Sequence, residues 1–218
     1  MKILYIFILS LIASVSSAQV IDTSDPQLMD NWINELNNTR PDTPMETVIG
    51  SPFLNDKFEK ATIKTRTQGE FQGIPIRYNL HQDHIEYINN GEVMVLFFGA
   101  QVMEAHLNGV IYKYLEASGQ KGGYQVIYEG EQVSVYKKQA IMLLPEKTGY
   151  GTVRTIEARY KKAPDSYLII DASGKVTSIK NKKELNSFTK PYRKDGSVPK
   201  SLDDSSMLAF AQRLDQND

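Results

Sequence analysis

Residues 103–114 read M-E-A-H-L-N-G-V-I-Y-K-Y and decide the fold class. Their central Asn108-Gly109 dipeptide strongly favours a two-residue type I′ turn between antiparallel strands. This turn brings apolar or small side chains together on one face of the hairpin and opposite charges together on the other, as in a half-buried sheet. The predicted cross-strand pairs are Leu107 with Val110, Ala105 with Tyr112, Met103 with Tyr114, and Glu104 with Lys113.

Two further turns continue the hairpin rhythm downstream. Gly130-Glu131 has glycine first, as a type II′ turn requires. Ala172-Ser173-Gly174 joins two apolar stretches, and its glycine can take the left-handed position of a bulged hairpin loop. The glycine-rich residues 119–123 lie between two strands and predict a flexible loop. The pairs predicted from Gly130-Glu131 are Tyr128 with Val133 and Val126 with Val135.

The chain between residues 53 and 180 is therefore predicted to be one antiparallel β domain. The four candidate strands upstream of the first hairpin are 58–66, 74–81, 85–88 and 93–98. Pro75 lacks an N–H, which suits an edge strand or the first position of a strand. The pattern is mainly β and leaves several architectures open: an antiparallel meander, a twisted sheet, a sandwich or a half-barrel.

Helical patterns flank the β domain on both sides. Residues 19–52 are predicted to form a short helix, with an apolar stripe that carries Trp32, followed by a polar, proline-rich linker arm. Residues 181–218 are predicted to form a C-terminal helical segment packed on the same domain. Within it, Lys182 to Phe188 forms one helix, and Ser201 caps a second one.

The N-terminus, residues 1–18, has the three parts of a cleavable secretory signal peptide. Lys2 supplies the charge, an apolar core follows, and Ser16-Ser17-Ala18 provides small residues before a cut at Gln19. The apolar core is about half the roughly 20 residues that cross a bilayer. We therefore expect an exported, periplasmic or secreted protein with no transmembrane segment after cleavage.

The absence of cysteine limits what export can add to this chain. Without cysteine there is no lipid attachment, so the protein is not predicted to be a lipoprotein, and no disulfide can stabilise it. Removal of Lys2 leaves 24 basic against 26 acidic residues, from totals of 25 and 26. A nearly neutral chain has no global attraction to nucleic acid, which is not a predicted partner.

The best candidate for chemistry is His81-Gln82-Asp83-His84-Ile85-Glu86. Histidine and carboxylate side chains bind metals, which makes His81, His84 and Glu86 metal-ligand candidates. In a continuous strand, however, His81 faces away from the other two. The third histidine, His106, is predicted to be a surface or half-buried strand residue opposite Ile111. No catalytic motif is found, so no catalytic residue, bound metal or cofactor is assigned.

Several scattered motifs resemble those of a family of uncharacterised, exported, β-rich proteins of Bacteroidetes. The resemblance spans most of the predicted mature chain with loose motifs, and it implies an envelope or secreted location but no activity. The residues that carry it are Gly50-Ser51-Pro52-Phe53-Leu54-Asn55, Phe58, Ile76-Arg77-Tyr78-Asn79-Leu80, Ile85-Glu86, Ser166-Tyr167-Leu168-Ile169, Gly174-Lys175 and Leu202 to Leu214.

The function predicted from these features is a soluble, non-enzymatic binding or scaffold protein of the cell envelope, with an envelope protein as partner. The first alternative is a carrier that holds a lipid or other apolar ligand in a curved sheet, and the second is a metal-dependent enzyme. One local charge asymmetry stands out: residues 175–200 hold eight basic and two acidic residues. Such a run is typical of a solvated surface. The sequence specifies no oligomeric state.

Overall fold

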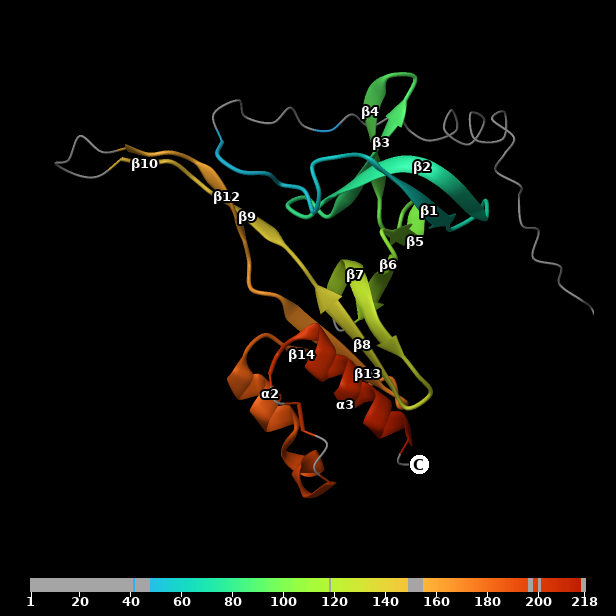
Figure 1. Cartoon of the computed structure of the whole chain (residues 1–218), viewed down its shortest axis with the longest axis vertical. Coiled ribbons are helices and arrows are strands. Elements are labelled where there is room, and N and C mark those ends of the chain that lie inside the picture. The colour runs from blue at the N-terminus through green and yellow to red at the C-terminus, as the bar shows by residue number, and fades with distance from the viewer. Residues whose placement is uncertain are drawn as a thin grey trace, which may run out of the picture.

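The computed structural model describes residues 41, 48–117, 119–148, 155–195, 198–199 and 201–216. The predicted signal peptide, the predicted N-terminal helix and most of the linker arm lie outside these residues. The described chain is mainly β with C-terminal helices (Figure 1), which confirms the predicted fold class.

Ten strands form one antiparallel sheet, in the order β14-β13-β8-β7-β6-β5-β1-β2-β3-β4. The described chain also contains two helices, a 3-10 helix and a ribbon of four short strands. The strands of the sheet are β1 (Glu59–Thr65), β2 (Glu70–Asn79), β3 (His84–Asn89), β4 (Glu92–Phe97), β5 (Val102–Leu107), β6 (Val110–Ala117), β7 (Gln120–Glu129), β8 (Val133–Lys138), β13 (Ser166–Asp171) and β14 (Val176–Ile179). The helices are α2 (Lys182–Phe188), η1 (Lys190–Asp195) and α3 (Asp204–Gln216).

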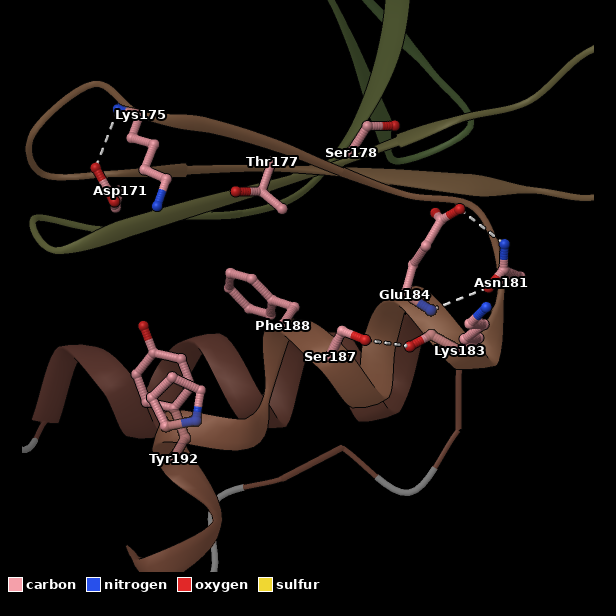
Figure 2. A pocket seen from close by; sticks show the side chains of 11 residues that line it. Asp171, Lys175, Thr177, Ser178, Asn181, Lys183, Glu184, Ser187, Phe188 and Tyr192 are labelled. Carbon is pink, nitrogen blue, oxygen red and sulfur yellow. Dashed lines mark hydrogen bonds between the residues drawn. The ribbon is translucent and has the colours of Figure 1, made fainter.

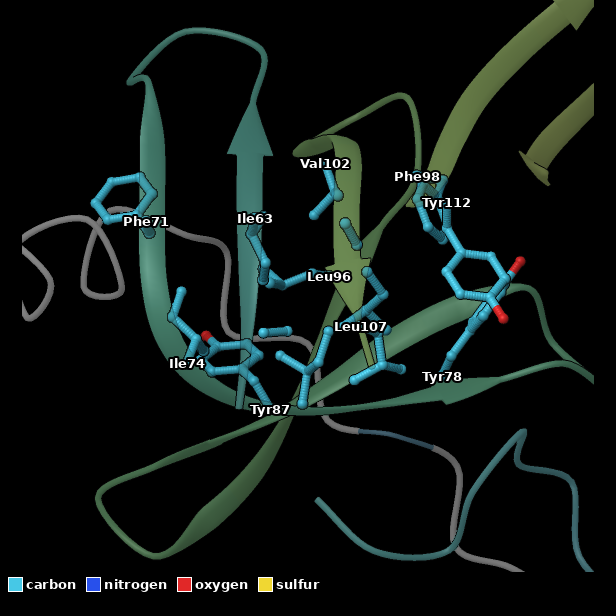
Figure 3. Close-up of a cluster of buried hydrophobic side chains, with 14 of the residues drawn as sticks. Ile63, Phe71, Ile74, Tyr78, Tyr87, Leu96, Phe98, Val102, Leu107 and Tyr112 are labelled. Carbon is cyan, nitrogen blue, oxygen red and sulfur yellow. The ribbon is translucent and has the colours of Figure 1, made fainter. Parts of the chain in front are cut away.

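The first half of the sheet, β1 to β6, curves around its own core (Figure 3). Buried side chains from all six strands meet there, among them Ile63, Phe71, Tyr87 and Leu96. No described helix contributes to this core. The curved half therefore buries its apolar face against itself, as a sheet that closes on itself does.

A β-bulge in β2 helps to produce this curvature. Ile63 of β1 pairs with Phe71, and Ala61 pairs with Ile74, so β2 carries one residue more than β1 between the two pairs. Gly73 takes a left-handed φ of +73° at this point, which glycine does at no steric cost. The extra residue lets Phe71 and Ile74 both face the core although they are three positions apart.

Pro75 follows this bulge and does not mark an edge. β2 lies between β1 and β3, so the expectation of an edge strand or first position is wrong. The pairing of β2 with β3 starts one residue later, at Ile76. The missing N–H of Pro75 therefore falls where the ladder to β3 has not yet begun.

The second half of the sheet, β7, β8, β13 and β14, is covered on one face by α2 and α3 (Figure 1). Val135, Ile169 and Ile179 of the strands pack there against Leu185 of α2 and Met207 of α3. Among the described residues, no helix has the length and apolar character that crossing a bilayer demands.

Between β8 and β13 the chain leaves the sheet as a narrow two-stranded ribbon, which extends away from the body in Figure 1. Its base pairs β9 (Ile141–Leu144) with β12 (Arg159–Lys162), and its outer part pairs β10 (Lys147–Thr148) with β11 (Thr155–Ile156). Ile49 joins the ribbon beside Arg159. Neither the ribbon nor this attachment follows from the turn signals of the sequence.

The Asn108-Gly109 turn forms as predicted. Both residues have positive φ angles, 54° and 76°, as a type I′ turn requires. The predicted register is present from Leu107 opposite Val110 to Glu104 opposite Lys113, with His106 opposite Ile111. The ladder ends there, one position before the predicted pair of Met103 and Tyr114. The ion pairs differ, because Glu104 binds Lys64 of β1 at 2.6 Å, while Lys113 binds Glu129 of β7 at 2.6 Å.

The pairing predicted from Gly130-Glu131 is wrong. The glycine N–H donates to the carbonyl of Val133 (3.1 Å), so Gly130 lies opposite Val133 and the turn is at Glu131 and Gln132. Tyr128 consequently pairs with Val135. A bulge at Ile127 accompanies the shift, so Ile127 and Tyr128 both pack on the helix side of the sheet.

The bulge sends Val126 to the opposite face of the sheet. There it packs with Tyr124, Tyr136 and Leu168 instead of with the valines of β8. The shifted turn is held by Asp215 of α3, whose Oδ1 accepts the N–H groups of Gln132 and Val133 (2.8 and 3.2 Å). A contact that spans more than eighty residues leaves no local signal in the turn.

Three other expectations concern one hairpin loop and the two C-terminal helices. Gly174 has a φ of +78°, which confirms the left-handed position predicted for it. α2 spans Lys182 to Phe188, as predicted. Ser201 is not the cap of α3: Asp203 caps it instead, since its Oδ1 accepts the N–H of Ser206 at 2.9 Å.

Candidate binding groove at the free edge of the sheet

The three residues predicted as metal-ligand candidates do not converge. His84 and Glu86 are two residues apart on β3, so they share a face, and both are buried. His81 lies in the turn before β3, where its Nδ1 atom is 3.0 Å from the carbonyl oxygen of Ile141. The described residues contain no group of three histidine or carboxylate side chains that could hold a metal ion.

Glu86 has a cationic partner within the chain. The Nε and Nη2 atoms of Arg77 donate to Glu86 Oε2 at 2.8 and 2.6 Å, and the guanidinium stacks on Phe53 and Phe58. Burial alone raises the pKa of Glu86, but hydrogen bonds from His84 and Arg77 outweigh it and hold the pKa below its usual value. Glu86 is thus an ionised partner of Arg77, and this pair connects β2 and β3.

A second polar cluster lies where the two halves of the sheet meet. Asp83, in the turn before β3, accepts hydrogen bonds from Tyr78 (2.5 Å) and Lys138 (2.7 Å). Lys138 also donates to the carbonyl of Gly123 at 2.9 Å. A Cβ atom at Gly122 would lie 2.0 Å from Asp83 Oδ2. This close approach is why glycine is needed there.

The same contacts correct the expectation of a flexible loop at residues 119–123. β7 begins at Gln120, so both glycines of the G-G pair are strand residues under a packed side-chain layer. Tyr78 is only 3% exposed, and burial raises its pKa well above the usual value. The cluster therefore joins the two halves of the sheet and offers no open site.

The interior of the curved half is filled by side chains. The space between its central residues is too small for a water molecule. A carrier function would need an apolar cavity of about 300 Å³ or more. The side chains that fill this space are Ile76, Tyr78, Ile85, Phe98, Ala105, Leu107 and Tyr112.

An open groove of about 810 Å³ lies in the other half of the molecule (Figure 2). It is bounded by the β13–β14 hairpin on one side and by α2 and the start of η1 on the other. Figure 2 shows Thr177 of β14 facing Phe188 of α2 across the groove, with Lys175 and Lys183 toward its two ends. The lining residues are Asp171, Lys175, Thr177, Ser178, Asn181, Lys183, Glu184, Ser187, Phe188, Pro191 and Tyr192.

The strand that borders this groove is an edge of the sheet. No described strand pairs with the outer side of β14. At the start of the hairpin, the N–H of Asp171 donates to the carbonyl of Lys175 at 3.2 Å. Because backbone groups alternate in direction along a strand, Val176 and Ser178 then direct their N–H and C=O groups outward. These groups can pair with an added strand.

The two carboxylates of the groove are already hydrogen-bonded by their own chain. Asp171 accepts the N–H groups of Ser173 and Lys175, each at 3.0 Å. Hydrogen bonds from the Ser173 side chain and these amides lower the pKa of Asp171. Glu184 accepts the N–H of Lys180 at 2.7 Å, which also ends the open run of β14. Both carboxylates thus stabilise turns.

Other polar side chains of the groove remain available to a ligand. Lys175, Thr177, Lys183 and Tyr192 make no side-chain hydrogen bond or ion pair with the described residues. The aromatic wall, in contrast, is well supported from behind. Phe188 and Tyr192 contact each other at 5.8 Å between ring centroids, and both contact Phe210 of α3 at 6.0 and 5.6 Å.

The sequence contains a signal for one feature of this groove, its lysines, and none for the other, the edge strand. The basic run at residues 175–200 covers its lysines, although it predicted a solvated surface. No sequence signal indicated that β14 is an edge strand, because strand order depends on long-range pairing. The chain matches no protein-family model, no curated protein and no solved structure.

Proposed function

We propose that this chain is an exported, non-enzymatic binding protein of the cell envelope, periplasmic or secreted and without a lipid anchor. Its binding site is the groove between β14 and α2, and its ligand is an extended segment of a partner protein. The segment adds to the sheet as a further strand along β14.

One observation carries this proposal: an edge strand with open backbone groups directly borders a groove with a supported aromatic wall. Strand addition draws affinity from main-chain hydrogen bonds and specificity from pockets that receive alternate side chains. The outward N–H and C=O groups of Val176 and Ser178 would supply the main-chain hydrogen bonds. The space beside Phe188 would supply a pocket for a side chain. The groove volume lies within the range of ligand sites.

The alternatives from the sequence have less support. A carrier would need free volume inside the curved half, where side chains fill the space. A metal-dependent enzyme built on His81, His84 and Glu86 would need these side chains to converge, whereas His81 contacts the ribbon and Glu86 binds Arg77. The groove is thus a better supported binding site than the curved core or the residues His81, His84 and Glu86.

The test is selection of ligands from a phage-displayed library of random dodecapeptides on the chain from Gln19 to Asp218. Ser178→Pro removes one outward N–H from β14 without touching an N–H that faces β13. Ser178→Ala is the matched control, because it removes the hydroxyl and keeps the N–H. We expect enriched peptides that bind the parent protein and Ser178→Ala equally and lose binding to Ser178→Pro.

Hydrogen exchange gives a second, direct measurement on the unmodified sequence. On addition of an enriched peptide, the amides of Val176 and Ser178 should exchange more slowly, because they gain strand partners. The proposal is wrong if no peptide is enriched, or if enriched peptides bind without protecting these two amides. In that case the lysines around β14 serve to keep other strands away from the edge.

A further inference from the structure

The elements around the groove carry several lysines, of which Lys175 and Lys183 line the groove itself, and these bear on the chemistry of its ligand. Five lysines lie along β14, α2 and the start of η1, and none of their ammonium groups makes an ion pair with the described residues. The two carboxylates among them are occupied by backbone N–H groups. These lysines are Lys175, Lys180, Lys182, Lys183 and Lys190.

The order of the side chains along the groove suits an extended ligand. Lys175 lies at the hairpin end of the groove and Lys183 at the other end, near the start of α2, with Phe188 between them (Figure 2). In an added strand every second side chain would face the groove, about 6.8 Å from the next. The inward side chains of such a strand would therefore meet a lysine, the aromatic wall and a second lysine in this order.

We infer that the groove binds an acidic segment of a partner protein, in which an apolar residue is flanked at two positions on either side by Asp or Glu. This inference rests on the function proposed above and defines its ligand. The apolar side chain packs on Phe188, and the two carboxylates pair with Lys175 and Lys183. The outward-facing positions of the segment are free to vary.

The probe is a fluorescein-labelled nonapeptide with the sequence Ser-Thr-Glu-Thr-Leu-Thr-Glu-Thr-Ser. Two comparison peptides have the same length: one has Lys in place of both Glu residues, and one has each Glu moved by one position, to the outward face. Binding to the chain from Gln19 to Asp218 is measured by fluorescence anisotropy. We expect the probe to bind most tightly and to weaken as salt is raised from about 50 to about 500 mM.

Charge reversal in the protein tests which lysines act. Both Lys175 and Lys183 are exposed, and Asp171 keeps its hydrogen bonds from the N–H groups of Ser173 and Lys175 in the variants, so the variants should fold. Since exposed ion pairs contribute modestly, we expect about threefold weaker binding for each of Lys175→Glu and Lys183→Glu, and about tenfold for both together. The lysine peptide should prefer the double variant to the parent protein. Lys121→Glu, an exposed change on β7, is the matched control and should bind the probe normally.

The outcomes separate this inference from the proposed function. If peptides selected from the library need the N–H of Ser178 but lack acidic residues, the acidic ligand is wrong and strand addition stands. If the probe binds the double variant and the parent protein equally, the inference is also wrong. Binding of a deoxythymidine decanucleotide that displaces the probe with the same sensitivity to charge reversal would replace the acidic peptide by a general polyanion.

Discussion

The two halves of the sheet bury their apolar faces in different ways. The half formed by β1 to β6 curves until its own strands meet, and no described helix enters its core. The half formed by β7, β8, β13 and β14 stays open and is covered by α2 and α3. One continuous sheet thus buries its apolar face in two ways, by curving on itself and by packing against helices. The half that packs against helices keeps a free edge strand and a groove beside it.

The difference has a local cause in the strands. In the curved half, the bulge at Gly73 bends β2 and brings Phe71 into the core. In the open half, the bulge at Ile127 instead turns Tyr128 toward the helices. The proposed binding groove lies in the open half, whereas side chains fill the space inside the curved half.

The largest effect is expected from a cavity in the curved core. Phe71→Ala removes a side chain that is 2% exposed and touched by no covering helix, and such changes cost about 4 kcal/mol. The free energy of unfolding is measured by chemical denaturation. Phe97→Ala is the matched control, since Phe97 is 40% exposed, and should cost about 1 kcal/mol or less. Equal losses would mean that the curved core is not the stabilising unit.

A smaller effect is expected in the open half. Met207→Ala removes a fully buried contact between α3 and the sheet and should cost about 3 kcal/mol. Leu208→Ala, a half-buried neighbour on the same helix, should cost less. Hydrogen exchange tests the comparison directly: Met207→Ala should accelerate exchange in β8 and β13 more than in β1 and β2. Uniform acceleration would show that the halves unfold as one unit.

At the junction between the halves, a single added methyl group should lower the stability of the fold. A Cβ atom at Gly123 would lie 2.5 Å from the Tyr78 hydroxyl oxygen and 2.7 Å from the Phe98 ring, so Gly123→Ala forces a shift that costs about 2 kcal/mol. Gly109→Ala has free space around it but a positive φ, which costs about 1 kcal/mol. Differential scanning calorimetry should rank the two losses in this order. The reverse order would mean that the junction is loosely packed.

Local signals in the sequence predicted the elements well. Asn108-Gly109 specified its turn and pairing because both depend only on backbone angles at two residues. The alternation of apolar residues predicted most strands of the sheet, although β2 begins at Glu70 rather than at residue 74, and the pattern of residues 182–188 predicted α2. These features depend on residues that are neighbours in the chain, so a local pattern in the sequence is enough to predict them.

Long-range contacts account for what the sequence did not predict. The turn after Gly130 depends on Asp215, and the strand character of Gly122 depends on Asp83 from another turn. Prediction of the groove would have required the knowledge that β14 is an edge strand, and this follows only from the order of all ten strands. The lysines of the groove could be recognised as a charge run in the sequence. The edge position of the strand beside them could not.

Asp215 allows the smallest and most specific test of the open half. Its carboxylate accepts hydrogen bonds from Tyr128 (2.7 Å) and from the N–H groups of Glu131, Gln132 and Val133, so α3 is tied to the turn between β7 and β8. These bonds, that of Tyr128 first, hold the pKa of Asp215 below its ordinary value of 3.8. The curved half has no equivalent helix anchor among the described residues.

The sign of the pH effect follows from this lowered pKa. The ionised carboxylate stabilises the fold at every pH above the unfolded value near 3.8, and the stabilisation is lost as the pH falls through the lower folded value. The melting temperature of Asp215→Asn should therefore lie below that of the parent protein at pH 7, with the gap closing below about pH 4. Asp56→Asn, an exposed change away from α3, serves as the control. A gap that persists at low pH would assign the stabilisation to side-chain shape rather than to the charge that holds the helix on the open half.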